Sequence, residues 1–233
     1  MSYIILNGVK NTYIQGLMIQ ALPSITKPQI RTNIETIDGR DGDIITKLGY
    51  AAYDKQLLIG LYGDYNIDEI IEYFNSEGTV TFSNEDDKYY NFQILEQIDF
   101  ERLIRYKQAV VTLHVQPFKY SLSEGEPEYP VRDESEVQIN NSGNIFSKPI
   151  LTISGSDTCD VYLNGVQVFS IAFGTNESIT IDTEAMEAYS GNILKNRIVT
   201  GDYNNFYLPI GVNRISFIGE VANFSIKNYS RWI

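Results

Sequence analysis

The chain has 233 residues and a formal net charge of −12, from 18 Lys plus Arg against 30 Asp plus Glu. Its 31 Ile against 8 Ala, together with 12% aromatic residues, favour β-strands over helical bundles. The single cysteine and single histidine exclude a disulfide framework and multi-histidine metal sites, and the net negative charge opposes nonspecific binding to nucleic acid or anionic lipid.

The first part of the chain reads as short strands separated by turns. Asn7-Gly8 is a strong hairpin signal because both positions tolerate a positive φ. Residues 30–37 alternate between two faces and stop at residues 38–43, a turn with two glycines and four charged residues. Residues 53–62 place Lys55 and three aliphatic residues on one face of a strand. Strands are predicted at residues 3–6, 17–22, 30–37 and 53–62.

The clearest helix signal begins after Asn66. This residue is suited to an N-cap, and Glu69 follows three residues later as in a capping box. Apolar residues at 67, 70, 71 and 74 share one helical face. Gly78 fits the position just after a helix end. The pattern predicts one helix of about three turns that plugs an end or side of a β-barrel.

Three more strands are predicted before a change in composition, at residues 79–82, 89–98 and 105–115. Residues 121–136 then combine two prolines with many acids and few apolar residues, which is typical of a linker or an extended arm. We therefore expect two domains, residues 1–133 and residues 134–233.

The second domain is again rich in strand signals. Asn164-Gly165 between alternating runs is the best hairpin signal in the chain. Strands at this spacing indicate a β-sandwich. They are predicted at residues 150–154, 160–163, 166–171, 178–182, 207–208, 214–218 and 222–227.

Candidate chemical groups are few. His114 lies in an alternating strand with no Ser or Cys motif pointing to it, and Cys159 stands beside acids that would raise its pKa. Asp38, Asp41 and Asp43 suggest a calcium loop, but Arg40 occupies a position where the EF-hand pattern places a ligand. A charged turn is the better interpretation, with Arg40 paired to an acid or to a neighbouring subunit. We expect no catalytic residue, no metal and no cofactor.

Aromatic residues leave two interpretations open. Tyr203, Phe206 and Tyr207 could stack on a glycan, or they could fill a β core and an oligomer interface. The second interpretation is the simpler one. The sequence has no apolar run of about 18 residues and no basic leader before an apolar stretch, so we expect no membrane span.

Taken in order, these elements resemble the distal tail protein family of long-tailed siphophages that infect Gram-positive bacteria. No single motif is specific, and the resemblance rests on their order and spacing over nearly the whole chain. The matching segments are Leu6-Asn7-Gly8, Asp38-Gly39-Arg40-Asp41-Gly42-Asp43, Gln116-Pro117-Phe118-Lys119-Tyr120, Asn141-Ser142-Gly143-Asn144 with Ser147-Lys148-Pro149-Ile150, Leu163-Asn164-Gly165, Ile181-Asp182, and Leu208-Pro209-Ile210-Gly211-Val212-Asn213.

The resemblance implies a mainly β structural protein at the virion tail tip, made in the cytoplasm of the host bacterium. An N-terminal split β-barrel with one helix and an extended belt would build a homohexameric ring with a channel for DNA. A galectin-like or carbohydrate-binding-module-like β-sandwich would project outward. The implied partners are the tail tube protein, the tail-associated lysin or tip protein, and receptor-binding or baseplate proteins. An acidic lumen would suit DNA passage, since like charges repel.

Two other functions remain open from the sequence. The first is a carbohydrate-binding module that recognises host cell-wall glycans through the C-terminal sandwich, with Tyr203, Phe206 and Tyr207 as stacking residues. The second and weakest is a glycan hydrolase, because 30 acids guarantee many chance carboxylate pairs and none is singled out. Neither sequence-specific nucleic-acid recognition nor membrane binding is expected.

Overall fold

The computed structural model describes residues 2–75, 77–123 and 136–233. The chain divides into two compact units, residues 1–122 with Ile233, and residues 123–232. The predicted boundary at residues 133 and 134 and most of the predicted linker at residues 121–136 lie outside the described residues. Among the helices described, none has the length and apolar character needed to cross a membrane.

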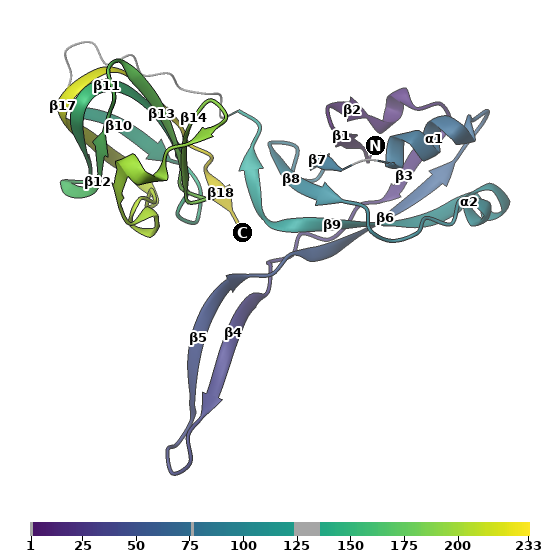
Figure 1. Ribbon diagram of the computed structural model, residues 1–233. Helices are drawn as coiled ribbons and strands as arrows, with labels where there is room; N and C mark the ends of the chain where they lie inside the picture. Colours follow the sequence, from purple (N-terminus) through teal and green to yellow (C-terminus); the bar gives the residue numbers. More distant parts are fainter. Residues whose placement is uncertain (1, 76, 124–135) are drawn as a thin grey trace. The chain divides into compact units, whose positions relative to one another are not determined.

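The first unit is built on an antiparallel sheet that curls around its own core (Figure 1). Its strand order is β2-β1-β7-β8-β9-β6-β3. The strands are β1 (Ile4–Leu6), β2 (Val9–Lys10), β3 (Leu17–Ala21), β6 (Tyr53–Leu61), β7 (Gly78–Phe82), β8 (Lys88–Gln93) and β9 (Gln108–Ser121), with a 3₁₀ turn η1 at Asn11–Tyr13.

Turn chemistry and alternation explain these strands. Asn7 and Gly8 have φ of 48° and 82°, which confirms the predicted hairpin between β1 and β2. On β6, Leu57 and Ile59 are fully buried, as the alternation predicted. Lys55 shares their face and is only 3% exposed.

Helix α1 (Ile67–Phe74) confirms the predicted start, because the Asn66 side chain accepts a hydrogen bond from the amide of Asp68. Ile70 and Phe74 are buried on the core side. Two details differ from expectation. Ile71 is 38% exposed, so the apolar stripe is narrower than predicted. The helix ends at Phe74, and Gly78 is the first residue of β7 rather than the helix-terminating glycine.

A second helix, α2 (Phe100–Tyr106), lies between the strands predicted at residues 89–98 and 105–115 and includes the first residues of the second one. Strand β8 stops at Gln93 and β9 begins at Gln108, so the predicted strands over residues 89–98 and 105–115 are each too long on the side facing α2. The helix is capped by Asp99, whose carboxylate accepts from the amide of Arg102 at 2.8 Å. Only Leu103 is fully buried, which leaves little periodic signal in the sequence.

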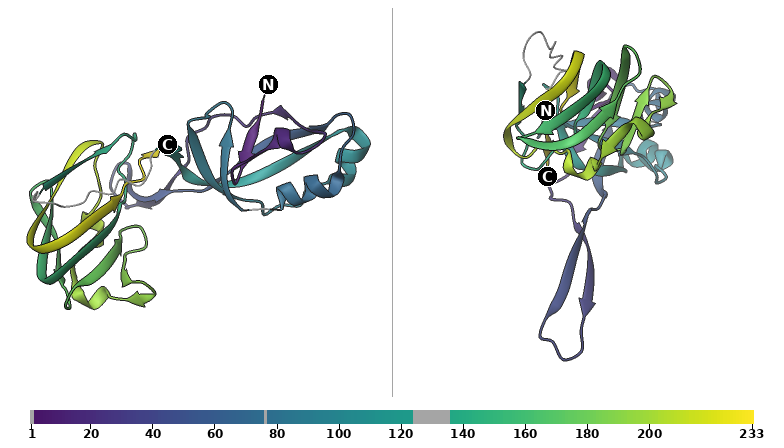
Figure 2. Two further views of the ribbon diagram at one scale, coloured as in Figure 1. Left: turned by 90° about the horizontal axis from the view of Figure 1, so that it is seen from above. Right: turned by 60° about the vertical axis from the view of Figure 1, so that its left-hand side comes forward.

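Two strands leave the sheet of the first unit as a separate ribbon, which we call the arm (Figures 1 and 2). Strands β4 (Ile30–Thr36) and β5 (Asp43–Tyr50) pair only with each other. The sequence predicted β4 and its turn but not β5. Ile44 and Ile45 are adjacent rather than alternating, because neither face of the ribbon covers a core.

Two long strands of the second unit, β11 and β17, each take part in both layers of the sandwich. The Ile150–Gly155 part of β11 pairs with β13, and the Thr158–Leu163 part pairs with β12. Strand β17 follows β11 along both parts. The strands are β10 (Glu136–Asn141), β11 (Ile150–Leu163), β12 (Val166–Ala172), β13 (Glu177–Asp182), β14 (Glu187–Ser190), β15 (Ile193–Leu194), β16 (Val199–Gly201), β17 (Gly211–Lys227) and β18 (Arg231–Trp232), with 3₁₀ turns η2 (Asn196–Ile198) and η3 (Tyr203–Asn205).

A bulge explains why β11 and β17 were each predicted as two strands. The pairing register shifts between Ser156 and Cys159, opposite Gly219. Gly219 has φ of 128°, and a Cβ there would lie 2.2 Å from the carbonyl oxygen of Thr158. Such a bulge bends a strand without ending it. The fold is therefore mainly β, with a curled N-terminal sheet and a C-terminal β-sandwich.

Candidate assembly interface

The groups most often used in catalysis are isolated in this structure. Nδ1 of His114 lies 2.8 Å from a carboxylate oxygen of Asp54 on the neighbouring strand, and both side chains are partly exposed. Cys159 is buried, and burial, with a smaller contribution from Asp160, raises the pKa of its thiol to about 11. Across residues 2–75, 77–123 and 136–233, no three His, Cys, Asp or Glu side chains gather as a metal site would require.

The arm is the most conspicuous unpartnered surface. Ile34 and Ile45 lie directly opposite each other in the ribbon and are 56% and 61% exposed. Leu48, farther along β5, is 58% exposed. A two-stranded ribbon without a third strand or a covering layer is marginally stable in water. These exposed aliphatic side chains therefore mark a surface suited to contact with another protein.

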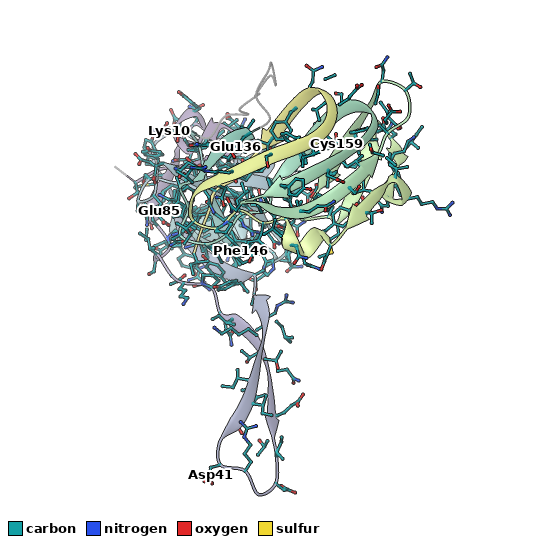
Figure 3. All side chains as sticks on the ribbon, turned by 90° about the vertical axis from the view of Figure 1, so that its left-hand side faces the viewer. Lys10, Asp41, Glu85, Glu136, Phe146 and Cys159 are labelled. Carbon is teal, nitrogen blue, oxygen red and sulfur yellow. The ribbon has the colours of Figure 1, made fainter. Side chains whose placement is uncertain are left out.

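The predicted turn residues lie at the tip of the arm, where Figure 3 labels Asp41. Asp38, Arg40 and Asp41 are all exposed. Gly39 and Gly42, with φ of 79° and 76°, provide the left-handed positions that the turn requires. Within the described part of the chain, none of the three charged side chains takes part in an ion pair. The three charges are therefore available to a neighbouring subunit.

The base of the arm is fixed by polar contacts to the first unit. Nζ of Lys55 donates to the carbonyl oxygen of Ser24 at 2.9 Å, and the hydroxyl of Tyr53 donates to that of Thr26 at 3.4 Å. The rings of Tyr50 and Phe118 meet edge to face at 5.5 Å. The chain on both sides of the ribbon is thus tied to the sheet, while the ribbon itself extends from it.

A buried charge cluster lies beside these contacts. Glu85 accepts hydrogen bonds from Lys119 at 2.7 Å and from the hydroxyl of Tyr90 at 2.8 Å. Burial lowers the pKa of Lys55, and Glu85 opposes that shift while Lys119 adds to it. Burial and the hydrogen bond to Glu85 raise the pKa of Tyr90. Sequence alternation placed Lys55 on the core face but gave no signal of the partner, which lies in the β7–β8 turn.

A groove of about 450 Å³ lies beside α1 in the first unit. Its lining combines apolar side chains such as Ile71 and Phe74 with the acids Glu77 and Glu96. It contains no acid–base pair suited to proton transfer, so it adds a surface hollow rather than a reaction centre.

The aromatic residues predicted as a glycan platform are divided between core and surface. Phe206 is completely buried and packs against Phe169, with ring centroids 5.4 Å apart. Tyr203 also packs on Phe169, and burial raises the pKa of its hydroxyl. Only Tyr207 is well exposed, at 42%. Its partner is Phe146, 40% exposed and 5.4 Å away edge to face, which the sequence reading missed.

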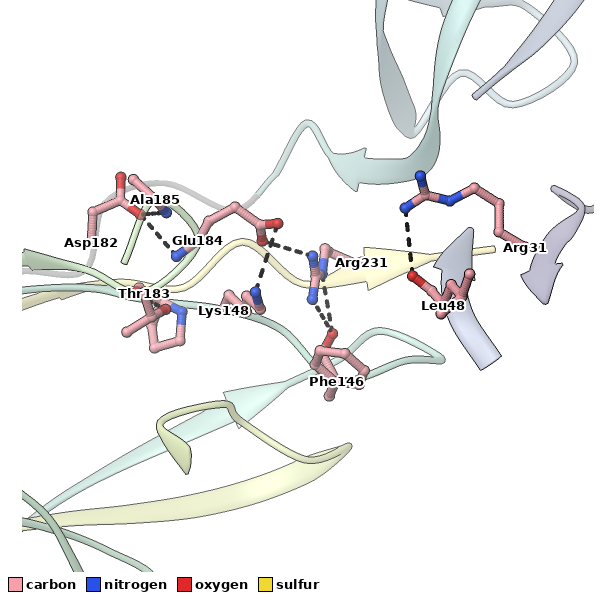
Figure 4. Close-up of polar contacts among 10 residues, drawn as sticks. Arg31, Leu48, Phe146, Lys148, Asp182, Thr183, Glu184, Ala185 and Arg231 are labelled. Carbon is pink, nitrogen blue, oxygen red and sulfur yellow. Dashed lines mark hydrogen bonds and ion pairs between the residues drawn. The ribbon is translucent and has the colours of Figure 1, made fainter. Parts of the chain in front are cut away.

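Phe146 is held by a polar network around Arg231 (Figure 4). Arg231 is 3% exposed and donates twice to the carbonyl oxygen of Phe146, at 3.1 and 3.0 Å. Its guanidinium also lies over the Phe146 ring and pairs with Glu184 at 3.0 Å. Lys148 approaches Glu184 at 3.9 Å. These contacts fix a loop and a ring, and they do not form a reaction centre.

The whole chain resembles solved structures of phage tail-tip proteins. It is similar to the Dit protein of phage SPP1, which is described as a paradigm of the hub of adsorption apparatus in phages that infect Gram-positive bacteria. The two chains share 13% identity with 100% of each covered and a TM-score of 0.65. No protein-family model and no curated protein matches the sequence.

Two further matches are chains of the phage P2 baseplate in its activated conformation. The structure with calcium gives 12% identity, 98% coverage of both chains and a TM-score of 0.52. The structure with strontium gives 14% identity, coverage of 98% of this chain and 97% of that one, and a TM-score of 0.51. At these identities the likeness establishes the fold, which is that of a siphophage distal tail hub protein.

Proposed function

We propose that the chain is a structural subunit of a phage tail tip that assembles as a homohexameric ring. The observation that carries the proposal is the full-length fold match to the SPP1 hub protein, at a TM-score of 0.65. In this role the ring joins the tail tube to the tail-associated lysin or tip protein and to receptor-binding or baseplate proteins. The ring leaves a channel for DNA, and its place is the virion tail tip.

The arm is an argument for a ring because its exposed side chains can form one of the two faces of a head-to-tail contact between subunits. A cyclic assembly needs two different faces on each subunit. The exposed pair Ile34 and Ile45 would be buried against the next subunit, where the apolar area removed from water favours association. The charged tip residues Asp38, Arg40 and Asp41 would add ion pairs that set the orientation of the contact.

Light scattering of the purified full chain, alone and with its tail-tube partner, tests this proposal. We expect a species with six times the mass of the 26.5-kDa chain. The double variant Ile34→Ser/Ile45→Ser should shift that species toward monomer without loss of strand content by circular dichroism. The matched control Ile193→Ser, on an exposed strand of the second unit, should leave the mass unchanged. A chain that stays monomeric under all these conditions contradicts the proposal.

A second candidate function is glycan binding by the β-sandwich, favoured by one observation. Tyr207 and Phe146 form an exposed aromatic pair, and such rings can stack on sugar faces. Titration with soluble cell-wall glycan should then show binding that is lost in Tyr207→Ala and kept in Tyr162→Ala, a half-buried tyrosine on β11. Equal binding by both variants, or no binding by the wild type, removes this function.

A further inference from the structure

The segment that enters the arm has no regular secondary structure of its own. This segment, residues 22–29, lies between β3 and β4, and we call it the arm root. Pro23 and Pro28 are buried, while the side chains between them are exposed. At the far end of the root, the amide of Ala51 donates to the carbonyl oxygen of Gln29 at 2.8 Å. The rest of the root lacks the strand pairing that would fix the direction in which the ribbon leaves the sheet.

Three side chains of the first unit hold the arm root by its carbonyl oxygens instead. Two of these donors come from β6 and the third from the β7–β8 turn, so the root is tied to two separate parts of the sheet. Each donor bonds a different carbonyl. The contacts are Nζ of Lys55 to Ser24 at 2.9 Å, the Tyr53 hydroxyl to Thr26 at 3.4 Å, and Nδ2 of Asn84 to Pro23 at 3.3 Å.

Lys55 makes the shortest of these bonds from a buried position. It is 3% exposed, and its Nζ lies 5.0 Å from the ring centroid of Tyr90 and 5.7 Å from that of Phe82. In the part of the chain that the structure describes, no carboxylate lies within ion-pair distance of this ammonium group, and the Ser24 carbonyl is its hydrogen-bond acceptor. Lys55 is therefore a buried cation whose bond is directed at the arm root.

The stability of the sheet does not account for a lysine at this position. Burying an ammonium group without a paired carboxylate costs free energy, and one carbonyl and the aromatic rings offset only part of that cost. Replacing a buried ion by an apolar side chain of similar volume is often neutral or stabilising. An apolar side chain, however, cannot bond the carbonyl of Ser24. What the lysine adds is a fixed position for the root.

We propose that Lys55 is a positioning residue that fixes the direction of the arm before two subunits meet. This inference rests on the proposed ring, in which the arm forms one face of the contact between subunits. An arm that is already held in its binding direction loses less conformational freedom on association, so the ring assembles at a lower concentration. Tyr53 and Asn84 act on the same root through uncharged and weaker hydrogen bonds.

The variant Lys55→Met separates positioning from stability. Loss of the bond to Ser24 should raise the concentration needed for half-assembly at least about tenfold, measured by light scattering of the full chain. Urea unfolding should show a first unit as stable as the wild type or more stable, because a buried charge is gone. Lys10→Met is the matched control, since it removes the same charge and a cation–π contact with Tyr3 from β2. It should leave the assembly concentration unchanged.

A second variant tests the arm root without altering the core. Asn84 and Asp86 are both exposed in the β7–β8 turn, and Asn84 is the one bonded to the root. Asn84→Ala should weaken assembly in the same direction as Lys55→Met but by a smaller factor, because the charged bond remains. Asp86→Ala should assemble like the wild type.

Single-molecule energy transfer measures the direction of the arm itself. Dyes on Asp41→Cys at the arm tip and Glu101→Cys on α2 report their separation in single subunits at high dilution, and both positions are exposed. The native Cys159 is completely buried and should not be labelled. We expect one narrow distribution for the wild type and for Lys10→Met, and a broader distribution for Lys55→Met.

Each outcome decides one question. A Lys55→Met chain that assembles like the wild type, or whose energy-transfer distribution is unchanged, overturns the proposal while the proposed ring stands. Weaker assembly accompanied by an equal loss of unfolding stability assigns Lys55 a purely structural role and also overturns it. If neither the wild type nor any variant forms rings, the proposed function fails, and energy transfer alone decides whether Lys55 holds the arm.

Discussion

Lys119 and Glu85 form an ion pair of 2.7 Å between side chains that are only 9% and 12% exposed. The pair joins β9 to the β7–β8 turn and lies next to Lys55, which holds the chain entering the arm. Glu85 therefore compensates buried cations at the base of the arm. Removal of the Glu85 carboxylate should lower the stability of the first unit more than the loss of a surface ion pair would.

Glu85→Gln should destabilise the first unit by about 3 kcal/mol, because it leaves Lys119 buried without a countercharge. Urea unfolding followed by circular dichroism measures the change. Glu85→Gln/Lys119→Met should recover much of the loss, since the uncompensated ammonium is gone. The exposed pair of Glu101 and Arg105 on α2 supplies the control, and Glu101→Gln should change stability by less than about 0.5 kcal/mol. A double variant less stable than Glu85→Gln alone would contradict this account.

Stability should fall in strongly alkaline solution because of buried tyrosines. Burial raises the pKa of Tyr73 above the ordinary value of 10.0. A raised folded-state pKa contributes stability that is fully present below pH 10 and is lost as pH rises toward the folded value. Tyr73→Phe should lose about 1 kcal/mol at neutral pH with the hydrogen bond to the carbonyl of Val9, and its stability should fall less steeply above pH 10. Unfolding titrations at several pH values measure both effects, and parallel curves would refute the assignment.

Cys159 should be inert in the folded protein. It is fully buried in the second unit, and its pKa is raised to about 11, so little thiolate exists at pH 8. Reaction with a chromogenic disulfide reagent should be undetectable over an hour in buffer and complete within minutes in concentrated urea. Rapid labelling of the native protein at pH 8 would show that the core around β11 opens readily.

Truncation of Phe206 should cost much more stability than truncation of Tyr207, although the two residues are adjacent. Phe206→Ala removes a fully buried ring and should cost about 3–5 kcal/mol of stability in the second unit. Tyr207→Ala removes a ring that is 42% exposed and should cost about 1 kcal/mol or less. Chemical unfolding compares them directly. Equal costs would mean that the Phe146–Tyr207 pair is a packing element rather than an available surface.

The sequence predicted those elements that are specified by residues close together in the chain. Asn164 and Gly165 have φ of 51° and 82°, which confirms the hairpin predicted from that dipeptide. Asn66 and the apolar spacing of α1 likewise located a helix start. Strand β5 was missed because its isoleucines, Ile44 and Ile45, are adjacent rather than alternating. Helix α2 was missed because Leu103 alone is fully buried.

The candidate surfaces were harder to predict because they depend on partners distant in sequence. Phe206 and Tyr207 look alike in sequence, and only the position of Phe169 and Phe146 separates core from surface. Glu85 is one of 30 acids, and nothing local marks it as the partner of Lys119.

The central claim is that this chain builds a ring, and electron microscopy of the purified full chain, alone and with its tail-tube partner, tests it most directly. Class averages should show closed particles with six-fold symmetry and a central opening. Particles of another symmetry without an opening, or single subunits at every concentration and with the partner present, would contradict the account.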